Sequence, residues 1–265
     1  MDKQTEKTIT ELSPWFHNIH LPDGAQTAPD HFLGDFPAFK WEEIAPELPW
    51  DLSGKKVLDV GCNAGFYSIQ LARRGAEVTA IDLDPHYLRQ AAWIAAQFGL
   101  EDRIQFSLQQ VYDLAHEEEK YDLVWFMGVF YHLRYPLLAM DILAQKCQDW
   151  FVFQSLSMPG KEVVKPDDDY QINQRDEMLK AGWPKMAFIE NQLNGDPTNW
   201  WAPNKAAVLA MMRSCGLEII SEPADETYIG RKTKAGASES WNRSEYLSAI
   251  GKDWKSNLEE KVKGK

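Results

Sequence analysis

The stretch Val57-Leu58-Asp59-Val60-Gly61-Cys62-Asn63-Ala64-Gly65-Phe66 predicts an apolar strand that runs into a glycine turn, with a helix directly after it. A second apolar segment, Glu77-Val78-Thr79-Ala80-Ile81, ends at Asp82, roughly 20 residues beyond Gly61. A strand, a glycine turn, a helix, a second strand and then an acid form the nucleoside-binding half of a doubly wound sheet. The sequence therefore predicts an α/β fold with a nucleoside site on its first half.

The spacing of the two glycines narrows the class of nucleoside. Gly61 allows a sharp turn, and Gly65 keeps the following helix close to the sheet and the backbone close to a ligand. Asn63 stands where dinucleotide-binding sequences have their middle glycine, which admits a pyrophosphate, so NAD and FAD are disfavoured. We expect Asp59, Gly61, Asn63 and Gly65 to form the ligand-binding turn.

Asp82 is the expected ribose ligand, because its carboxylate can accept two hydrogen bonds from a ribose diol. Its alternative role is to cap the helix that begins near Pro85, but Asp84 is better placed for that task. Leu108-Gln109-Gln110 follow the third predicted strand, where an adenine ring would rest on one side chain and meet a polar group. A plain loop is an equal alternative for these three residues.

Strands and helices alternate over residues 55–230, which is typical of a parallel sheet covered on both faces. The connection Pro223-Ala224-Asp225 is too short for a crossover and predicts a hairpin with one antiparallel strand. Residues 1–13 are polar and expected to be frayed. The predicted strands are 56–60, 77–82, 103–107, 121–126, 150–155, 217–222 and 226–231, and the predicted helices are 65–74, 85–98, 135–146 and 203–215. The predicted domains are a cap (1–50), a nucleoside-binding domain (51–232) with an inserted lid (157–202), and a C-terminal helical extension (233–265).

Composition limits the partners. The chain has 265 residues, 44% of them hydrophobic, which is ample for a core. A formal net charge of −12 argues against a nucleic-acid partner, since a phosphate backbone is usually bound by a basic face. The three cysteines are far apart, which predicts a reducing, cytoplasmic environment. No apolar run is long enough to span a membrane. The sequence leaves the oligomeric state open, and a homo-oligomer is possible.

The second informative stretch runs from Tyr121 to Leu133. Its strand is expected to end at Met127-Gly128 beside the ligand crevice, where Met127 would present a polarizable thioether. Tyr131 and His132 follow at the same edge. His132 titrates near neutrality and is a candidate general base, although a packed or capping histidine is the commoner case.

Residues 157–202 interrupt the alternation and are rooted at the carboxyl ends of the strands, where ligands bind in such sheets. We expect this insert to form a lid over a second substrate. Its Trp200 and Trp201, together with Trp15 from the N-terminal cap, are the expected walls of the pocket, although filling of the core is the commoner use of tryptophan.

His17 and His20 lie three residues apart in the cap. With no cysteine and no clear carboxylate beside them they are a weak zinc signal, so no metal is predicted. Both remain candidates for contact with a substrate, and His17 is an alternative base.

The chain resembles class I S-adenosylmethionine-dependent methyltransferases over about residues 55–230. Leu58-Asp59-Val60-Gly61-Cys62-Asn63-Ala64-Gly65 is similar to the first motif of that superfamily, and Ala80-Ile81-Asp82 to its acidic second motif. A narrower likeness, to the tRNA wobble-uridine methyltransferase-like group, is carried by Met127-Gly128-Val129-Phe130-Tyr131-His132, Phe39-Lys40-Trp41 and Asn199-Trp200-Trp201-Ala202-Pro203-Asn204.

The resemblance implies a doubly wound, Rossmann-like α/β fold with a seven-stranded sheet, and S-adenosylmethionine as cofactor. It implies cofactor contacts for Lys40, Gly61, Asp82, Gln109, Met127 and Tyr131. The tRNA enzymes of the group bind a carboxylated cofactor through a lysine shortly after a Pro-Trp pair. Here Pro14-Trp15 is followed by Phe16-His17, which favours the plain cofactor.

Together these features predict methyl transfer to a small-molecule acceptor, most simply to an oxygen. His132, with His17 or His20 as alternatives, would take the acceptor proton, and Tyr131 is a further candidate catalytic residue. Trp15, His20, Trp200 and Trp201 would contact the acceptor. The alternatives are a tRNA wobble-uridine (carboxy)methyltransferase and, in another class, a non-catalytic nucleoside-binding module.

Overall fold

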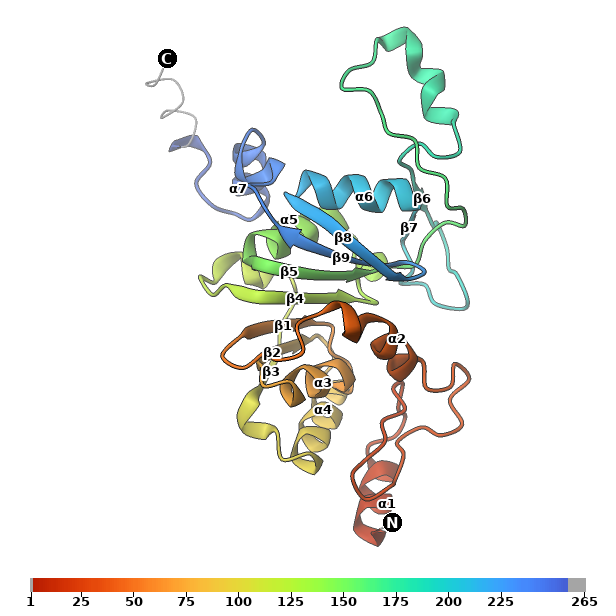
Figure 1. Ribbon diagram of the computed structural model, residues 1–265, viewed down its shortest axis with the longest axis vertical. Helices are drawn as coiled ribbons and strands as arrows, with labels where there is room; N and C mark the ends of the chain where they lie inside the picture. Colours follow the sequence, from red (N-terminus) through yellow and green to blue (C-terminus); the bar gives the residue numbers. More distant parts are fainter. Residues whose placement is uncertain (1, 257–265) are drawn as a thin grey trace. The chain divides into compact units, whose positions relative to one another are not determined.

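The structure is a computed structural model that describes residues 2–256 (Figure 1). Within these residues seven strands form one sheet in the order β3-β2-β1-β4-β5-β9-β8, so the strand order reverses between β1 and β4. The predicted fold class, a doubly wound α/β sheet of seven strands, is confirmed. The strands are β1 (Lys56–Val60), β2 (Glu77–Asp82), β3 (Ile104–Leu108), β4 (Tyr121–Met127), β5 (Cys147–Gln154), β8 (Leu217–Ala224) and β9 (Thr227–Lys232).

The four predicted helices are present, with ends that differ from the prediction by a few residues. Helix α4 begins at Pro85, where the Asp84 carboxylate accepts a hydrogen bond from the His86 backbone N–H at 2.7 Å, as the sequence predicted. The helices are α1 (Lys3–Glu11), α2 (Phe36–Ile44), α3 (Phe66–Arg73), α4 (Pro85–Gln97), α5 (Pro136–Lys146), α6 (Lys205–Ser214) and α7 (Arg243–Ala249). The described 3-10 turns are Ala45–Glu47, Glu101–Arg103, Asp113–His116, Phe130–His132, Ile172–Leu179 and Ala237–Glu239.

The prediction that residues 1–13 are frayed was wrong. They contain helix α1, which is held by Trp15: its indole N–H donates to the Ile9 carbonyl at 2.8 Å, and its ring packs 5.9 Å from that of Trp93. Trp15 is buried by these contacts. It therefore anchors the N-terminal helix, in place of the role as a pocket wall that we expected.

The chain divides into two compact units. The first holds residues 1–113 and 118–125, and the second holds residues 114–117 and 126–265, so the boundary falls inside β4. The predicted division into cap, nucleoside-binding domain and C-terminal extension follows other boundaries and stays a prediction. The two units are described separately below.

In the second unit, β9 pairs antiparallel with both β5 and β8, which confirms the predicted hairpin. Asp225 and Glu226 form its turn, and Glu226 has a φ of +62°. The insert 157–202 is largely irregular, as predicted. It also contributes to a small antiparallel sheet that the sequence did not indicate, β6 (Met186–Phe188) with β7 (Trp201–Pro203).

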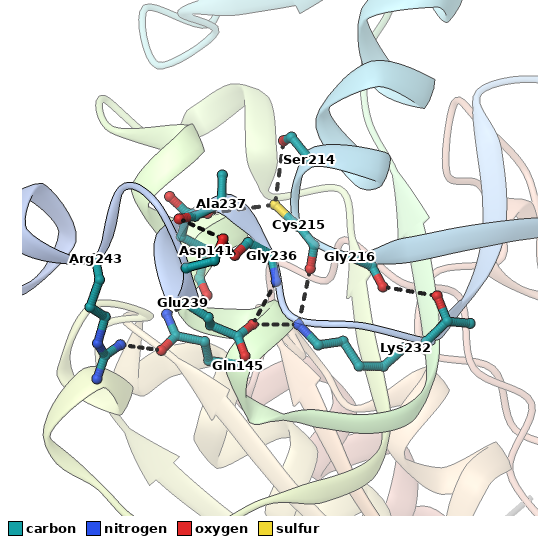
Figure 2. Close-up of polar contacts among 12 residues, drawn as sticks. Asp141, Gln145, Ser214, Cys215, Gly216, Lys232, Gly236, Ala237, Glu239 and Arg243 are labelled. Carbon is teal, nitrogen blue, oxygen red and sulfur yellow. Dashed lines mark hydrogen bonds and ion pairs between the residues drawn. The ribbon is translucent and has the colours of Figure 1, made fainter. Parts of the chain in front are cut away.

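The segment after β9 is fastened to the second unit by the polar cluster in Figure 2. Lys232 donates to the Cys215 carbonyl at 3.0 Å and to the Glu239 carboxylate at 2.5 Å. The backbone approach is so close at Gly236 that a Cβ there would lie 2.8 Å from the Cys215 carbonyl carbon. Burial raises the pKa of the Cys215 thiol to about 12, so this cysteine is a packing residue and not a nucleophile.

Helix α7 lies within the predicted C-terminal helical extension (233–265) and ends at Ala249. The predicted extension beyond residue 256 lies outside the described residues. Among residues 2–256, no helix combines the length and the apolar character that crossing a bilayer requires.

Candidate functional site

The glycine turn of the first unit joins β1 to α3. Gly61 and Gly65 have φ angles of +71° and +83°, and Asn63, with a φ of +50°, also takes the left-handed conformation. A Cβ on Gly65 would lie 3.0 Å from the Cβ of Ala91 in α4. Gly65 is therefore required both by its backbone conformation and by the packing of the turn against α4.

The backbone donors of this turn are all used within the protein. Gly61 and Cys62 donate to the Ile81 carbonyl at 2.8 and 3.0 Å, which ties the turn to the end of β2. The remaining N–H groups donate from Asn63 to Asp82, from Ala64 to the Asn63 side chain, and from Gly65 to the Cys62 carbonyl. A loop that binds phosphate must present such donors to its ligand. Residues 61–65 therefore leave no backbone donor for a phosphate, in agreement with the sequence, which disfavours NAD and FAD.

Asp82 stands at the end of β2 with both carboxylate oxygens engaged. One oxygen accepts from the Asn63 N–H and the other from the Asp84 N–H, each at 2.9 Å. The Leu83 backbone N–H is a third donor to this carboxylate, which still has acceptor capacity for a ribose hydroxyl. Partial burial is the largest influence on this carboxyl and raises its pKa.

Two leucines flank Asp82 with their side chains exposed. Leu83 follows it in the chain and is 62% exposed, and Leu108 is its register partner on β3 and is 61% exposed. Gln109 donates its backbone N–H to the Asp82 carbonyl at 3.0 Å. Exposed apolar side chains beside the acid that is predicted to bind ribose are compatible with the predicted adenine platform at residues 108–110. Leu83 is an additional apolar surface that the sequence analysis missed.

Asp59 is buried, whereas we expected it to belong to the ligand-binding surface of the turn. It is 1% exposed and accepts a hydrogen bond from the Ser68 hydroxyl of α3 at 2.5 Å. Burial raises the pKa of its carboxyl to about 7. Asp59 therefore holds α3 on β1, so its role is structural.

His17 is also less suited to its expected role. Its ring is 6% exposed and lies 5.5–6.4 Å from the rings of Phe36, Phe66 and Tyr67. Burial, with smaller effects from His31 and Lys40, lowers its pKa to about 3. A group that is so weakly basic is a poor proton acceptor at neutral pH, which disfavours His17 as the general base. Its Nδ1 atom has no hydrogen-bond partner among the described residues.

His20 and Lys40 lie elsewhere in the first unit. His20 is exposed and pairs with the Asp35 carboxylate at 2.9 Å. Lys40 is part of α2 and acts on the charge of His17. Within residues 2–256, no three histidine, cysteine or carboxylate side chains are grouped closely enough to hold a metal ion.

The second unit holds the other predicted residues. Met127 is buried at the end of β4, and Tyr131 and His132 follow in a 3-10 turn with their rings 4.2 Å apart. Burial raises the pKa of Tyr131 to about 12, so its phenol stays protonated at neutral pH. Tyr131 is therefore a hydrogen-bond donor and not a base.

His132 has two neighbours that sequence reasoning missed. Its Nδ1 lies 2.9 Å from the Thr198 hydroxyl and 3.8 Å from the Asp196 carboxylate. A local signal existed, since Asp196 accepts from the Thr198 backbone N–H at 2.7 Å in the turn that an Asp-Pro-Thr sequence favours. The sequence could indicate this turn but not its proximity to His132.

Trp200 and Trp201 lie on the same part of the second unit. The backbone N–H of Trp200 donates to the Tyr131 carbonyl at 2.8 Å, and the indole ring of Trp200 stacks with the ring of Phe188. The Arg134 guanidinium lies 4.8 Å from the Trp200 ring. The Trp201 indole nitrogen and the Asn199 side-chain oxygen are buried and lack a hydrogen-bond partner among the described residues.

Comparison with known proteins bears on the segment that contains the glycine turn, Asp82 and His132. Residues 57–145 match a family model described as a methyltransferase domain. The segment 57–145 is therefore similar to a methyltransferase domain. A tRNA U34 carboxymethyltransferase from Pseudomonas putida (strain W619) is 38% identical over 176 residues, which are 63% of this chain and 52% of that protein. The chain spans about half the length of the curated relatives that it matches. The resemblance stated from the sequence is confirmed.

Solved structures show the same fold at low sequence identity. The N-terminal domain of EvdMO1, solved with SAH bound, is 17% identical with a TM-score of 0.58, over 88% of this chain and 98% of that domain. The [4+2]-cyclase SpnF is 17% identical with a TM-score of 0.52, over 93% of this chain and 80% of that one. A fold that appears in proteins with such different names does not identify the reaction.

Proposed function

We propose that this protein transfers a methyl group from S-adenosylmethionine to a small-molecule acceptor, and that the acceptor atom is an oxygen. The observation that carries the proposal is the glycine turn of the first unit, whose backbone donors are all used internally and which lies beside the half-buried carboxylate of Asp82. The match to a methyltransferase domain supports it.

The cofactor has chemistry that these residues fit. It contains a ribose diol, for which the Asp82 carboxylate retains acceptor capacity, and an adenine, for which Leu83 and Leu108 offer apolar surface. It contains no phosphate, and the turn reserves no donors for one. Its sulfonium supplies an electrophilic methyl group when it is bound. Lys40, Gln109, Met127 and Tyr131 remain proposed contacts.

The residues proposed for the acceptor lie in the second unit. His132 would take the proton of an acceptor hydroxyl, and Tyr131 would donate a hydrogen bond through its neutral phenol. Trp200 offers a flat apolar surface, while the unpaired polar atoms of Trp201 and Asn199 could bind a polar group of the acceptor. The enzyme's contribution to an in-line methyl transfer is mainly to hold the acceptor oxygen in position and to exclude water.

The test of this proposal begins with the ligand. Mass spectrometry of the purified protein, followed by calorimetry with S-adenosylmethionine, S-adenosylhomocysteine and NAD, should show micromolar binding of the first two and none of the third. Release of S-adenosylhomocysteine with a panel of small hydroxyl-bearing acceptors would then identify the acceptor. The absence of heat with either sulfur nucleoside would reject the proposal.

A second candidate function is favoured by the names of the relatives, several of which are tRNA U34 carboxymethyltransferases. Against it stand the net charge of −12 and the burial of His17 at the position of that group's cofactor-binding lysine. Removing residues 160–184, the outer part of the insert, distinguishes both methyltransferase functions from the third alternative, a protein that binds a nucleoside without catalysis. Loss of methyl transfer with retained cofactor binding is expected for an enzyme whose insert covers the acceptor.

A further inference from the structure

The proximity of His132 to the 195–201 turn gives this histidine a defined hydrogen-bond chain. The Thr198 hydroxyl donates to the Asp196 carboxylate at 2.6 Å, and the same carboxylate oxygen accepts from the Thr198 backbone N–H at 2.7 Å. The His132 Nδ1 lies 2.9 Å from the Thr198 hydroxyl oxygen. The other Asp196 oxygen lies 3.8 Å from that Nδ1.

This chain determines which nitrogen of His132 carries the proton. A threonine hydroxyl has one proton, and here the ionised carboxylate is the stronger acceptor for it. The hydroxyl oxygen can then only accept from His132, so Nδ1 must be protonated. In the neutral ring, Nε2 is consequently the atom with a free lone pair.

We propose that Asp196 and Thr198 are positioning residues for His132, which they hold with its proton on Nδ1 so that Nε2 is the proton acceptor in catalysis. The inference rests on the proposed function and extends it to two residues of the insert. In the transfer, the acceptor O–H proton would move to Nε2 as the oxygen–methyl bond forms. The sulfur–methyl bond breaks, and its electron pair stays on sulfur, which leaves a neutral thioether and an imidazolium that the Asp196 carboxylate stabilises.

The chain is not needed to hold the turn in place. The backbone N–H of Trp200 donates to the Tyr131 carbonyl at 2.8 Å, and Leu193 and Asp196 exchange two backbone hydrogen bonds at 3.2 and 3.1 Å. The Asn199 side chain also donates to the Leu193 carbonyl at 2.9 Å. These bonds hold the turn in place. The bond from His132 to Thr198 is additional to these. If the contact served only to anchor the insert, the hydrogen bond between His132 and Thr198 would not be needed.

The groups that act on the charge of His132 can be named. Burial lowers the pKa of His132, while the charge of Asp196 and a hydrogen bond with the Thr198 backbone raise it. Tyr131 contacts its ring but stays neutral, Glu226 acts on Tyr131, and the cationic Arg134 lies against the Trp200 ring. Removing the Asp196 carboxylate should therefore lower the pKa of His132, because the imidazolium loses its nearest anion.

The experiment is long-range ¹H–¹⁵N NMR on the full chain labelled with ¹⁵N-histidine, with His132 assigned from the His132→Gln variant. We expect the Nδ1–H tautomer in the wild type and a lower His132 pKa in Asp196→Asn. Thr198→Val should lose the tautomer preference, and Thr198→Ser, which keeps the hydroxyl, should restore it. A wild-type Nε2–H tautomer, or an unchanged His132 pKa in Asp196→Asn, would overturn the inference.

A kinetic measurement ties the tautomer to catalysis. The rise of kcat with pH should move to lower pH in Asp196→Asn, with a lower plateau and little change in cofactor affinity. A dependence of kcat on pH that is unchanged in both Asp196→Asn and Thr198→Val would also overturn the positioning role. Failure to bind S-adenosylmethionine rejects the proposed function and the role of the base with it, whereas a wrong tautomer with intact cofactor binding rejects this inference alone.

Discussion

Asp82 supports the glycine turn and carries the proposed ribose contact with the same carboxylate. We expect Asp82→Ala to weaken S-adenosylhomocysteine binding by about 1.5–3 kcal/mol, as is typical for losing hydrogen bonds to a charged acceptor. Isothermal titration calorimetry measures this loss. Equal affinity in the variant and the wild type would show that Asp82 is not a ligand.

Asp84 provides the matched control, since it is an acid two residues away that caps α4 and accepts from His86. Asp84→Ala should lower the free energy of unfolding by about 1 kcal/mol through the lost cap and leave cofactor affinity close to that of the wild type. If both variants lost affinity equally, a general loosening of the β2–α4 connection would explain the effect of Asp82→Ala.

Gly65 is constrained twice, by a φ of +83° and by the Cβ of Ala91, which a new Cβ would approach to 3.0 Å. Gly65→Ala should therefore lower the free energy of unfolding by about 2–4 kcal/mol, from backbone strain and overpacking together. Gly99→Ala is the control: its φ is +64° but nothing lies within 4 Å, so only the strain, about 1–2 kcal/mol, applies. Urea denaturation should rank Gly65→Ala as the more destabilised variant, and the reverse order would contradict the packing argument.

The buried, neutral state of His17 bears on the predicted preference for the plain cofactor over the carboxylated one. With its pKa lowered to about 3 by burial, it is neutral at pH 7 and offers no positive charge to an extra carboxylate. We expect competition binding to favour plain S-adenosylmethionine, and His17→Lys to shift the preference toward the carboxylated form. A wild-type preference of tenfold or more for the carboxylated form, about 1.4 kcal/mol, would contradict this.

At the scale of elements, the joint between β1 and α3 contains a carboxyl that should make stability depend on pH. The pKa of Asp59 is raised from 3.8 to about 7, so between these values the folded state holds a proton that the unfolded state has released. The free energy of unfolding should therefore fall as the pH rises from about 4 to about 7. Asp59→Asn, which cannot ionise, should lack this part of the fall.

Urea denaturation at pH 5 and pH 8 measures the difference. Ser68→Ala removes a hydrogen bond that lowers the Asp59 pKa, so its pKa should rise further and the fall in stability should extend to higher pH. Identical pH profiles for the wild type and Asp59→Asn would show that Asp59 is already ionised in the folded protein at low pH.

At the scale of the whole molecule, charge bears on the choice between a small acceptor and tRNA. The chain has 40 acidic and 28 basic residues, whereas proteins that bind a phosphate backbone usually present a basic face. We expect no saturable tRNA binding in a gel-shift titration at about 0.15 M salt. Tight, saturable binding with a steep salt dependence would overturn the small-molecule proposal and support the tRNA alternative.

Local chemistry made much of this protein predictable. The apolar runs and glycine turns placed the principal strands and helices, and Asp84 before Pro85 marked the start of α4 correctly. Helix α1 was missed because its sequence is polar and its support comes from Trp15, outside the helix. Strand, turn and cap preferences act over a few residues, so they can be read from neighbouring letters.

The tertiary structure alone decided what the functional side chains face. Asp59 and His17 look like ligands in the sequence, but packing buries both and shifts their pKa values in opposite directions, since burial disfavours the charged form of each. His132 was recognisable, whereas its partner Thr198 is 66 positions away in the chain. Burial and long-range hydrogen bonds depend on how distant segments pack together, and no local pattern of residues contains that information.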